Sequence, residues 1–439
     1  YPLRRQRQMC IRDRYKHIIF LGLLMGKIDI ESISFLDPAT QSCPYEAYKT
    51  LRSECPVYQI PEVGFYMITK YDDARTVIKN TEIYSNTYSH QQGYESEGVK
   101  RHSEIMNNEG FGKKPITLQR TDPPIHTKYR KLLNKAFTLS RVREMGPYIS
   151  DVVNDLIDGF IDKGECEFVS EYAVPIPCTI IADQLGVPRE YLGKFKEWSD
   201  AMLIPASGMA SVEEMENAAR LEVESQHYFK SIFDKKRKNP TDDIISDLVN
   251  ADFDGERKLT EDELQDLINQ LLTGGNETTT SSIAHGMWLL LRHPDQMEKV
   301  INNHDLIPNF VEETIRYETP VQGLFRTAMA DSEIRGVKIP KGSTLLVRYA
   351  ALNRDEETFS DPEIFDIERK DVGKHLAFGS GAHHCIGASL ARAEMHAAFK
   401  YFFERIKNIE LARELEEIPH HPSIFLHQLK ELPIKFNKQ

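Results

Sequence analysis

A helical pattern of unusual length runs from Thr260 to His293, and its centre contains residues that disfavour a helix. Thr260-Glu261-Asp262-Glu263 is a capping-box signature, and Pro294 marks the end of the pattern. Globular helices average about 11–12 residues, so this one is far longer. Its centre reads Thr273-Gly274-Gly275-Asn276-Glu277-Thr278-Thr279-Thr280, and each interior glycine costs about 1 kcal/mol relative to alanine. We therefore expect function to require this segment, with a bulge or a water-filled widening there; a surface kink is the alternative.

The rest of the chain predicts a mainly α-helical fold with a small β portion. Apolar residues at helical spacing recur through the middle of the chain, including Leu264, Leu267 and Ile268 in the long helix. Alternating segments at 57–60 and 64–68 predict a hairpin, and strand patterning returns around 337–347. No linker, repeat or low-complexity tract divides the sequence after residue 30. We therefore expect a single large domain.

Composition narrows the class of protein. The chain has 439 residues, a net charge of −12 and no basic stripe with interleaved aromatic residues, which argues against nucleic acid as a partner. Six cysteines without a pairing pattern suggest a reducing compartment, so we expect a cytoplasmic protein. The apolar run from Ile18 to Met25 is too short to span a bilayer, which needs about 20 residues. We expect no membrane association, a non-native or disordered extension at 1–24, and a domain at 25–439.

A glycine-rich loop delivers one cysteine to the start of a helical segment. The loop is Phe378-Gly379-Ser380-Gly381-Ala382-His383-His384-Cys385-Ile386-Gly387, and the segment that follows has strong helix formers and no proline. A thiolate at a helix start is stabilised by the helix dipole and by free N–H groups, so Cys385 is a candidate metal ligand. A small buried hydrophobe is one alternative. Zinc is another, but the other five cysteines are scattered and supply no CxxC pair.

The loop resembles the haem-binding loop of the cytochrome P-450 family, because Phe378–Gly387 matches FGxGxHxCxG at every specified position. The resemblance covers roughly residues 30–439. It implies the cytochrome P-450 fold and haem b (iron protoporphyrin IX) as cofactor, with Cys385 as the axial ligand of the iron and with Phe378, Gly379 and Gly387 beside it. It also implies a soluble monooxygenase of the bacterial type, which inserts one atom of O2 into a lipophilic small molecule.

The centre of the long helix is similar to the distal-helix pattern (A/G)Gx(D/E)T of that family. The match implies that Gly274 and Gly275 let the cofactor approach the backbone, and that Glu277 and Thr278 are catalytic. Activation of O2 requires two protons at the distal oxygen without access for bulk water. By resemblance, Thr278 and Glu277 supply them.

Glu313-Thr314-Ile315-Arg316 places an acid and a base three residues apart on one helical face, which alone indicates an ordinary salt bridge. It also resembles the family's ExxR motif, which an arginine after the Phe365-Asp366 segment completes. Arg369 is in that position. The implied role of Glu313, Arg316 and Arg369 is structural, since the triad would fix the core behind the thiolate loop.

The two propionates of a haem need cationic or hydrogen-bonding partners. Each candidate alone is more easily read as an ordinary polar residue, but together they suggest one cofactor. The resemblance implies as propionate partners His126, Arg130, Arg326, His375 and His383.

Substrate and partners are implied by the resemblance alone. Candidate substrate contacts are Gln270, Thr273, Val321, Leu324, Ile424 and Phe425. Electrons would come from NAD(P)H indirectly, through a separate reductase and a ferredoxin or flavodoxin, and basic residues at 128–135 offer a docking surface or merely a solvated helix face. We expect a monomer.

Three readings stay open beside this one. A haem-thiolate scaffold also suits an isomerase or dehydratase, and it suits a haem-based sensor. Separately, Pro419-His420-His421-Pro422 contains two histidines without an assigned role, for which metal binding is an alternative.

Overall fold

The computed structural model describes residues 30, 33–87, 96–111, 115–207, 210–253, 255, 257–414 and 419–439, and the predicted extension at 1–24 lies outside them. Helices dominate, as predicted. The helices are α2 Pro38–Ser42, α3 Tyr45–Glu54, α4 Tyr71–Lys79, α5 Glu97–Asn108, α6 Ile125–Asn134, α7 Leu139–Glu144, α8 Gly146–Phe160, α9 Pro175–Leu185, α10 Leu192–Ser207, α11 Val212–Lys238, α12 Ile244–Asn250, α13 Glu261–Arg292, α14 Pro294–Asn302, α15 Ile307–Tyr317, α16 Tyr349–Leu352 and α17 Ala388–Arg405.

The β portion is small and falls into separate sheets. A five-stranded sheet has the order β1-β2-β10-β7-β3, and a three-stranded sheet has the order β11-β12-β4. The first is formed by β1 Val57–Gln59, β2 Tyr66–Ile68, β3 Tyr84–Ser85, β7 Leu324–Ala328 and β10 Thr344–Val347. The second is formed by β4 Glu165–Glu167, β11 Ile406–Leu411 and β12 Pro433–Lys438, and two hairpins pair β5 Asp252–Phe253 with β6 Arg257–Lys258 and β8 Ser332–Ile334 with β9 Val337–Ile339.

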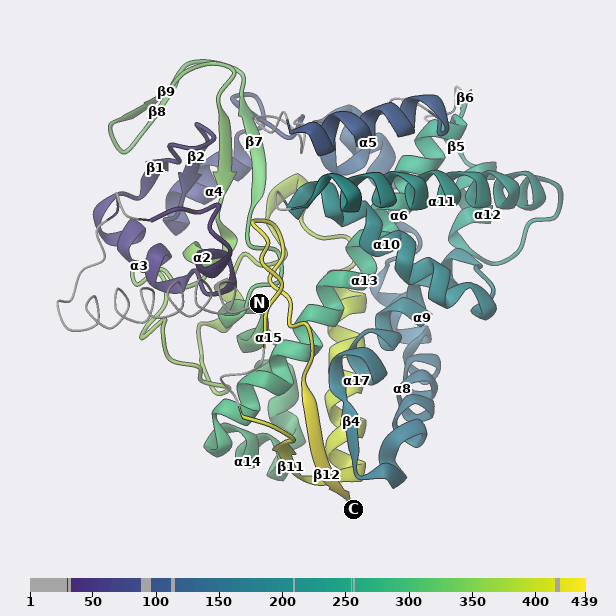
Figure 1. The fold of residues 1–439 in the computed structure, drawn as a ribbon, viewed down its shortest axis with the longest axis vertical. Coiled ribbons are helices and arrows are strands. Elements are labelled where there is room, and N and C mark those ends of the chain that lie inside the picture. Colours follow the sequence, from purple (N-terminus) through teal and green to yellow (C-terminus); the bar gives the residue numbers. More distant parts are fainter. Residues whose placement is uncertain are drawn as a thin grey trace, which may run out of the picture.

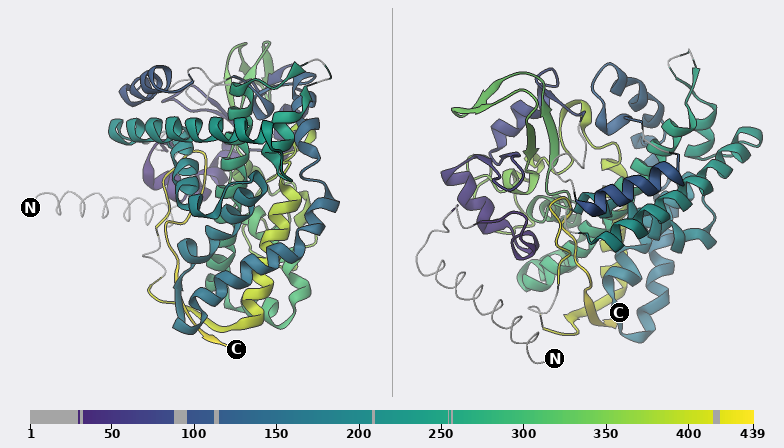
Figure 2. Two further views of the ribbon diagram at one scale, coloured as in Figure 1. Left: turned by 90° about the vertical axis from the view of Figure 1, so that its right-hand side faces the viewer. Right: turned by 45° about the horizontal axis from the view of Figure 1, so that its top comes forward.

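The predicted N-terminal hairpin is the antiparallel pair β1 and β2, with Tyr58 opposite Met67. Strand β10 then runs parallel to β2 and antiparallel to β7, so a segment from the C-terminal half completes the N-terminal sheet. Figure 1 shows this sheet with α3 and α4 on one side of the molecule and most of the other helices on the opposite side. Figure 2 shows α5 and α11 lying against each other across the helical side.

Helix α13 is the predicted long helix, and it spans 32 residues between the capping box at Thr260 and Glu263 and the C-cap His293. It is in contact with α9, α10, α15 and α17. We expected a bulge or a water-filled widening at its centre; the bulge is wrong, because the helix is continuous through Gly274–Gly275, and the widening stays a prediction. Packing of α13 against these four neighbours outweighs the local cost of the two glycines.

The core has one large apolar cluster between α8, α13, α15 and α17, which includes Ile157, Met287, Phe310 and Phe402. A second cluster is formed by residues of α6, of the four helices from α9 through α12, and of the first half of α13. The centre of α13 lies between its residues 264–272, which belong to the second cluster, and its residues 283–290, which belong to the first. In the loop that contains Cys385, Phe378 packs against the first cluster and Ile386 against the second. None of the helices among the described residues combines the length and the apolarity that crossing a bilayer requires.

Candidate active site

The cysteine loop has the backbone that its glycines predict. Gly379 and Gly381 adopt φ of 68° and 67°, in the left-handed region that residues with a side chain rarely enter. The N–H of Cys385 donates to the carbonyl of Phe378 at 2.8 Å, which closes the loop just before Gly387, the N-cap of α17. The loop therefore holds the sulfur at the start of a helix of 18 residues.

The Cys385 side chain is accessible, yet burial is the strongest influence on it and raises the pKa of its thiol. A side chain that is accessible and also surrounded by protein lines an internal space. The N–H groups of Gly387 and Ala388 and the guanidinium groups of Arg130 and Arg392 favour the thiolate instead. A metal ion in that space would complete this effect, because a coordinating thiol is deprotonated outright.

One face of α13 is also accessible inside an otherwise buried helix. Gly274 is exposed, Thr273, Gly275 and Thr278 are half-buried, and the other residues from 271 to 280 are buried. A Cβ at Gly274 would meet nothing within 4 Å, whereas a Cβ at Gly275 would lie 3.1 Å from the side chain of Ile181 on α9. Gly274 therefore opens onto free space beside α13. Gly275 instead faces α9, and because it has no side chain the two helices can pack closely there.

Buried donors without partners lie beside the cysteine loop. The His126 and His383 rings are 4.0 Å apart, and His126 Nε2, His383 Nε2 and Arg326 Nε have no hydrogen-bond partner among the described residues. Burial and the neighbouring His126, Arg326 and Arg130 lower the pKa of His383 to about 3. Burial and then Arg130 also lower the pKa of His126. Unpaired buried donors cost free energy, so this set fits an anionic group such as a carboxylate that is bound there.

His375 differs from the other predicted propionate partners. Its Nε2 lies 3.0 Å from Glu312 Oε2, and its Nδ1 accepts from the N–H of Ala377 at 3.2 Å. Arg392 also binds Glu312, at 2.6 and 2.8 Å. Although burial opposes it, these two partners hold the pKa of Glu312 at about 2. Both ring nitrogens of His375 are thus engaged within the chain, whereas His126, His383 and Arg326 each keep a nitrogen without a partner among the described residues.

The structure brings Glu313, Arg316 and Arg369 together in the core. Arg316 Nε and Nη2 lie 2.6 and 2.8 Å from the Glu313 carboxylate, and Arg369 Nε lies 3.1 Å from it. The two guanidinium groups also donate to carbonyls between 353 and 364, for example Arg316 to Asn353 at 3.0 Å and Arg369 to Ile364 at 2.8 Å. This network fixes the irregular segment that precedes the cysteine loop.

Glu277 is buried and has partners from three parts of the chain. Its Oε1 accepts from Ser199 Oγ at 3.2 Å and from Asn276 Nδ2 at 2.9 Å, and Lys196 Nζ lies 3.3 Å away. Its Oε2 accepts from Gln428 Nε2 at 2.9 Å. Thr278 Oγ1 donates to the carbonyl of Gly274 at 3.0 Å, one turn earlier in α13. Of the predicted pair, the acid is therefore buried and the hydroxyl lies on the accessible face.

The sequence did not indicate the groups that connect Glu277 to the surface. Lys196 contacts both Glu277 and Asp200, whose side chain is 52% exposed. Burial and the nearby Glu277 raise the pKa of Asp200 to about 6. The spacing of Lys196 and Asp200 predicts one helix face, but no local signal places that face against α13.

A second buried acid was also missed. Glu394 on α17 is only 2% exposed and lies near Thr279 on α13, and burial raises its pKa to about 8. Glutamate is common in helices, so nothing in the local sequence indicates that Glu394 is buried. Its burial results from tertiary packing.

The candidate substrate residues differ in how accessible their side chains are and in whether they already have partners. Gln270 donates to Thr117 Oγ1 and Asp266, both at 2.9 Å, and accepts from the N–H of Gln119 at 3.0 Å. Its amide is thereby fully used in holding the turn before α6.

Ile424 is 4% exposed and belongs to the core cluster under the five-stranded sheet. We therefore withdraw Gln270 and Ile424 as substrate contacts. The side chains that stay partly accessible are those of Thr273, Val321, Leu324 and Phe425.

Comparisons with known proteins identify the family. Residues 212–434 match the family model for Cytochrome P450. Over 413 residues the chain is 34% identical to Cytochrome P450 107B1 of Saccharopolyspora erythraea, which covers 93% of this chain and 98% of that protein. The chain belongs to the cytochrome P450 family. The 6-deoxyerythronolide B hydroxylase of the same organism is 33% identical and covers 90% of this chain and 96% of that protein.

The solved structure of the P450 CYP109Q5 from Chondromyces apiculatus matches with a TM-score of 0.81 and 34% identity, over 94% of this chain and 100% of that one. The mainly α fold predicted from the sequence is therefore the P450 fold. With relatives named as monooxygenases and hydroxylases, this P450 is a monooxygenase, and its family implies a thiolate-bound haem and the use of O2.

Proposed function

We propose that this P450 hydroxylates or epoxidises a lipophilic small molecule, with Cys385 as the axial ligand of haem b. The observation that carries the proposal is the pairing of an accessible Cys385 at a helix start with an accessible Thr278 next to a buried Glu277. The first supplies a thiolate, and the second supplies a hydroxyl and an acid. An oxygenase needs both.

The described residues fit a haem. Cys385 would hold the iron, Gly274 leaves room beside α13, and the unpaired donors of His126, Arg326 and His383 would bind propionates together with Arg130. When bound, a thiolate-ligated haem supplies the activation of O2, because electron donation from the sulfur favours cleavage of the O–O bond. Binding of the haem would also give hydrogen-bond partners to the unpaired nitrogens of His126, Arg326 and His383.

The protein's own residues handle the protons. Oxygen insertion consumes the substrate, O2, two electrons and two protons, and it yields the oxygenated product and water. Thr278 can turn its hydroxyl from the Gly274 carbonyl toward the accessible face, and Glu277 stands behind it. Lys196 and Asp200 connect Glu277 to solvent, so a proton lost at Glu277 can be replaced from the surface.

Two observations bear on the class of substrate. The partly accessible side chains of Val321, Leu324 and Phe425 are apolar. One similar structure, CYP109E1 from Bacillus megaterium, is in complex with testosterone, at 30% identity and a TM-score of 0.80. Both observations favour a lipophilic ligand of this P450.

Electrons come, in our proposal, from NAD(P)H through a reductase and a ferredoxin or flavodoxin, to a monomeric enzyme in the cytoplasm. The exposed Lys131 and Lys135 lie at the end of α6, and Arg130 on the same helix influences Cys385. An acidic carrier that docks there would approach the cysteine side of the haem. An isomerase, a dehydratase or a sensor would not need protons for the activation of O2, and the surface-connected Glu277 therefore favours the oxygenase.

The test has two arms. Lipophilic compounds that shift the haem Soret band are incubated with electron donors under isotopically labelled O2, and the product is expected to contain one labelled oxygen atom. A converted product without labelled oxygen would instead support the isomerase or dehydratase. The reduced, carbon monoxide-bound spectrum tests the axial ligand: Cys385→Ser should lose the thiolate band, and retention of that band would rule out Cys385.

A further inference from the structure

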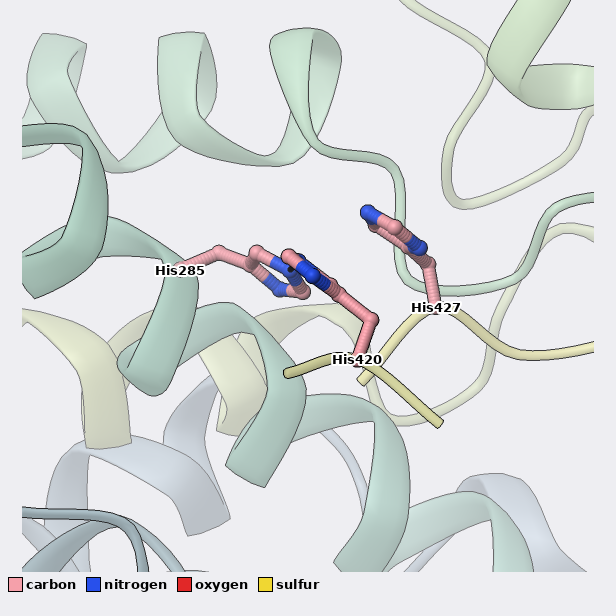
Figure 3. Close-up of side chains that lie close together, drawn as sticks. All are labelled: His285, His420 and His427. Carbon is pink, nitrogen blue, oxygen red and sulfur yellow. Dashed lines mark hydrogen bonds between the residues drawn. The ribbon is translucent and has the colours of Figure 1, made fainter. Parts of the chain in front are cut away.

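Three histidines from distant parts of the sequence meet on the face of α13 that packs against the C-terminal segment. One ring nitrogen of each of His285, His420 and His427 lies within 4.8 Å of the others. Figure 3 shows the three rings side by side, with His285 on the helix and the other two on the C-terminal segment. Backbone bonds between His421 and Gln428 and between Lys430 and Pro419 fold that segment into a hairpin.

The outer partners of two rings fix their protons. His285 Nδ1 lies 2.9 Å from the carbonyl of Ser281, which can only accept, so Nδ1 carries the hydrogen and Nε2 keeps a lone pair. His427 Nε2 lies 3.2 Å from Glu318 Oε2. Glu318 is buried, and although burial opposes it, His427 and Arg354 hold its pKa well below its usual range. The Glu318 carboxylate therefore accepts a hydrogen bond from the Nε2–H group of His427.

That assignment leaves His427 Nδ1 as a lone pair, and it has no partner among the described residues although the residue is only 2% exposed. His420 Nε2 lies 3.4 Å from His285 Nε2. Neutral imidazoles are the form that binds metals.

We propose that His285, His420 and His427 bind a zinc ion. Three imidazoles without a thiolate suit zinc, which takes nitrogen ligands at about 2.0–2.1 Å in a tetrahedral arrangement. Two nitrogens of such a site are about 3.3 Å apart, close to the separation of His285 and His420. The Ser281 carbonyl and the Glu318 carboxylate stand where the outer partners of metal-binding histidines normally stand.

The rings must turn for all three to bind. His420 and His427 are stacked at 4.5 Å with 11° between their planes, and His285 and His427 at 4.8 Å with 12°. A metal lies in the plane of each imidazole, so the rings have to rotate about their Cβ–Cγ bonds, a torsion with a broad minimum. The bonds of His285 to the Ser281 carbonyl and of His427 to Glu318 have to adjust with this rotation. His420 is half-buried and adjoins the exposed His421, which gives the ion a route from solvent.

Zinc at this site would fasten the C-terminal hairpin to α13. Gln428, next to His427, donates to Glu277 at 2.9 Å, so the ion would also fix a partner of that acid. The inference stands on the histidines alone and is independent of the oxygenase chemistry.

The test measures zinc binding to the haem-loaded protein. Titration with zinc chloride, followed by elemental analysis after dialysis, should give about one zinc for each chain, and zinc-edge X-ray absorption should show nitrogen ligands at about 2.0 Å. His420→Ala should weaken binding at least about tenfold. His420 is chosen because it is only half-buried, so its replacement threatens folding less than that of His285 or His427.

His421→Ala is the matched control, since it removes the adjacent, exposed histidine and should bind zinc like the parent. Zinc should also raise the Tm of the parent and of His421→Ala but not of His420→Ala. Equal affinity of the parent and His420→Ala would overturn the site and leave the three rings as a hydrogen-bonded stack. Equal loss in both variants would overturn it as well, because it would indicate a surface site at the two neighbouring histidines.

Discussion

Thr278 is the residue whose position and chemistry are most directly linked. Its hydroxyl donates within α13 to Gly274, so the side chain is held on the accessible face while Glu277, one residue earlier, points into a buried polar group. A residue pair on a helix places its side chains about 100° apart, which is why one can face an open space and the other the protein.

We predict that Thr278→Ala keeps substrate binding but uncouples electron consumption from product formation. The hydroxyl that would position a proton is lost, and the side chain that remains cannot donate. The measurement is the ratio of product to NAD(P)H consumed, which should fall several-fold while the Soret shift on substrate binding is retained. Thr273→Ala, which removes another half-buried hydroxyl five residues earlier in α13, is the control and should keep coupling. A coupling ratio in Thr278→Ala equal to that of the parent would contradict the role of Thr278.

At the level of elements, the packing of α13 depends on a glycine that the sequence pattern did not single out. A Cβ at Gly286 would lie 2.5 Å from Phe399 on α17 and 3.2 Å from Phe310 on α15. We predict that Gly286→Ala destabilises the protein by about 1–3 kcal/mol, because overpacking outweighs the gain of about 1 kcal/mol in helix propensity.

Gly159→Ala on α8 is the matched control, since a Cβ there meets nothing within 4 Å. This variant should gain about 0.5–1 kcal/mol. Urea unfolding of both variants beside the parent measures the two effects. Destabilisation of both to the same extent would show that the cost arises from the backbone and not from the contact with Phe399.

Glu394 makes the contact between α13 and α17 sensitive to pH. The folded protein keeps its proton up to about pH 8, whereas the unfolded chain releases it near the ordinary value of 4.5. The folded state therefore binds more protons between these values, and stability from this residue falls as pH rises, by up to about 1.4 kcal/mol for each pH unit.

We predict that Glu394→Gln loses this part of the pH dependence and is relatively more stable than the parent at pH 8.5 than at pH 5.5. The urea midpoint of the haem-loaded protein at both values is the measurement. Glu404→Gln changes an exposed acid on the same helix and should follow the parent. Parallel pH curves for the parent and Glu394→Gln would show that Glu394 is ionised in the folded protein.

The elements also show what the sequence could and could not predict. The limits of α13 were predictable because its caps are local: Thr260 and Glu263 bind each other's backbone, and Pro294 follows directly. The continuity of α13 was not, since four neighbouring helices compensate for Gly274 and Gly275. The cysteine loop was predictable because its signal is local as well: Gly379 and Gly381 themselves indicate the backbone conformation that they adopt.

The groups around Glu277 were beyond prediction, because Ser199 and Gln428 are 78 and 151 residues away in the sequence. The same holds for the three histidines, of which the sequence singled out only one. His375 is a predicted propionate partner whose bond to Glu312 was not foreseen, since a motif position does not reveal which neighbour a ring nitrogen takes. Contacts between distant segments thus decided most of the differences.

At the scale of the whole molecule, the charge distribution bears on the redox partner. The chain carries a net charge of −12, so an acidic carrier is repelled by most of the surface. Helix α6 is an exception, with Lys131 and Lys135 exposed at its end and with His126 and Arg130 beside the cysteine loop. A local basic surface on a repulsive background selects both the partner and its orientation.

We predict that the double variant Lys131→Glu/Lys135→Glu is reduced by a ferredoxin at least about tenfold more slowly than the parent at low ionic strength, because charge reversal replaces attraction by repulsion at the docking surface. Stopped-flow reduction in the presence of carbon monoxide measures the rate. The difference should shrink as salt rises to about 1 M, where charges are screened beyond about 3 Å.

Lys49→Glu/Lys407→Glu makes the same change of charge at exposed positions on α3 and β11, and it should leave the rate within about twofold of the parent. An unchanged rate in the α6 variant would mean that the carrier docks elsewhere. An equal loss in both variants would mean that only net charge matters. A specific loss that salt abolishes is the result that assigns electron entry to the α6 side of the haem.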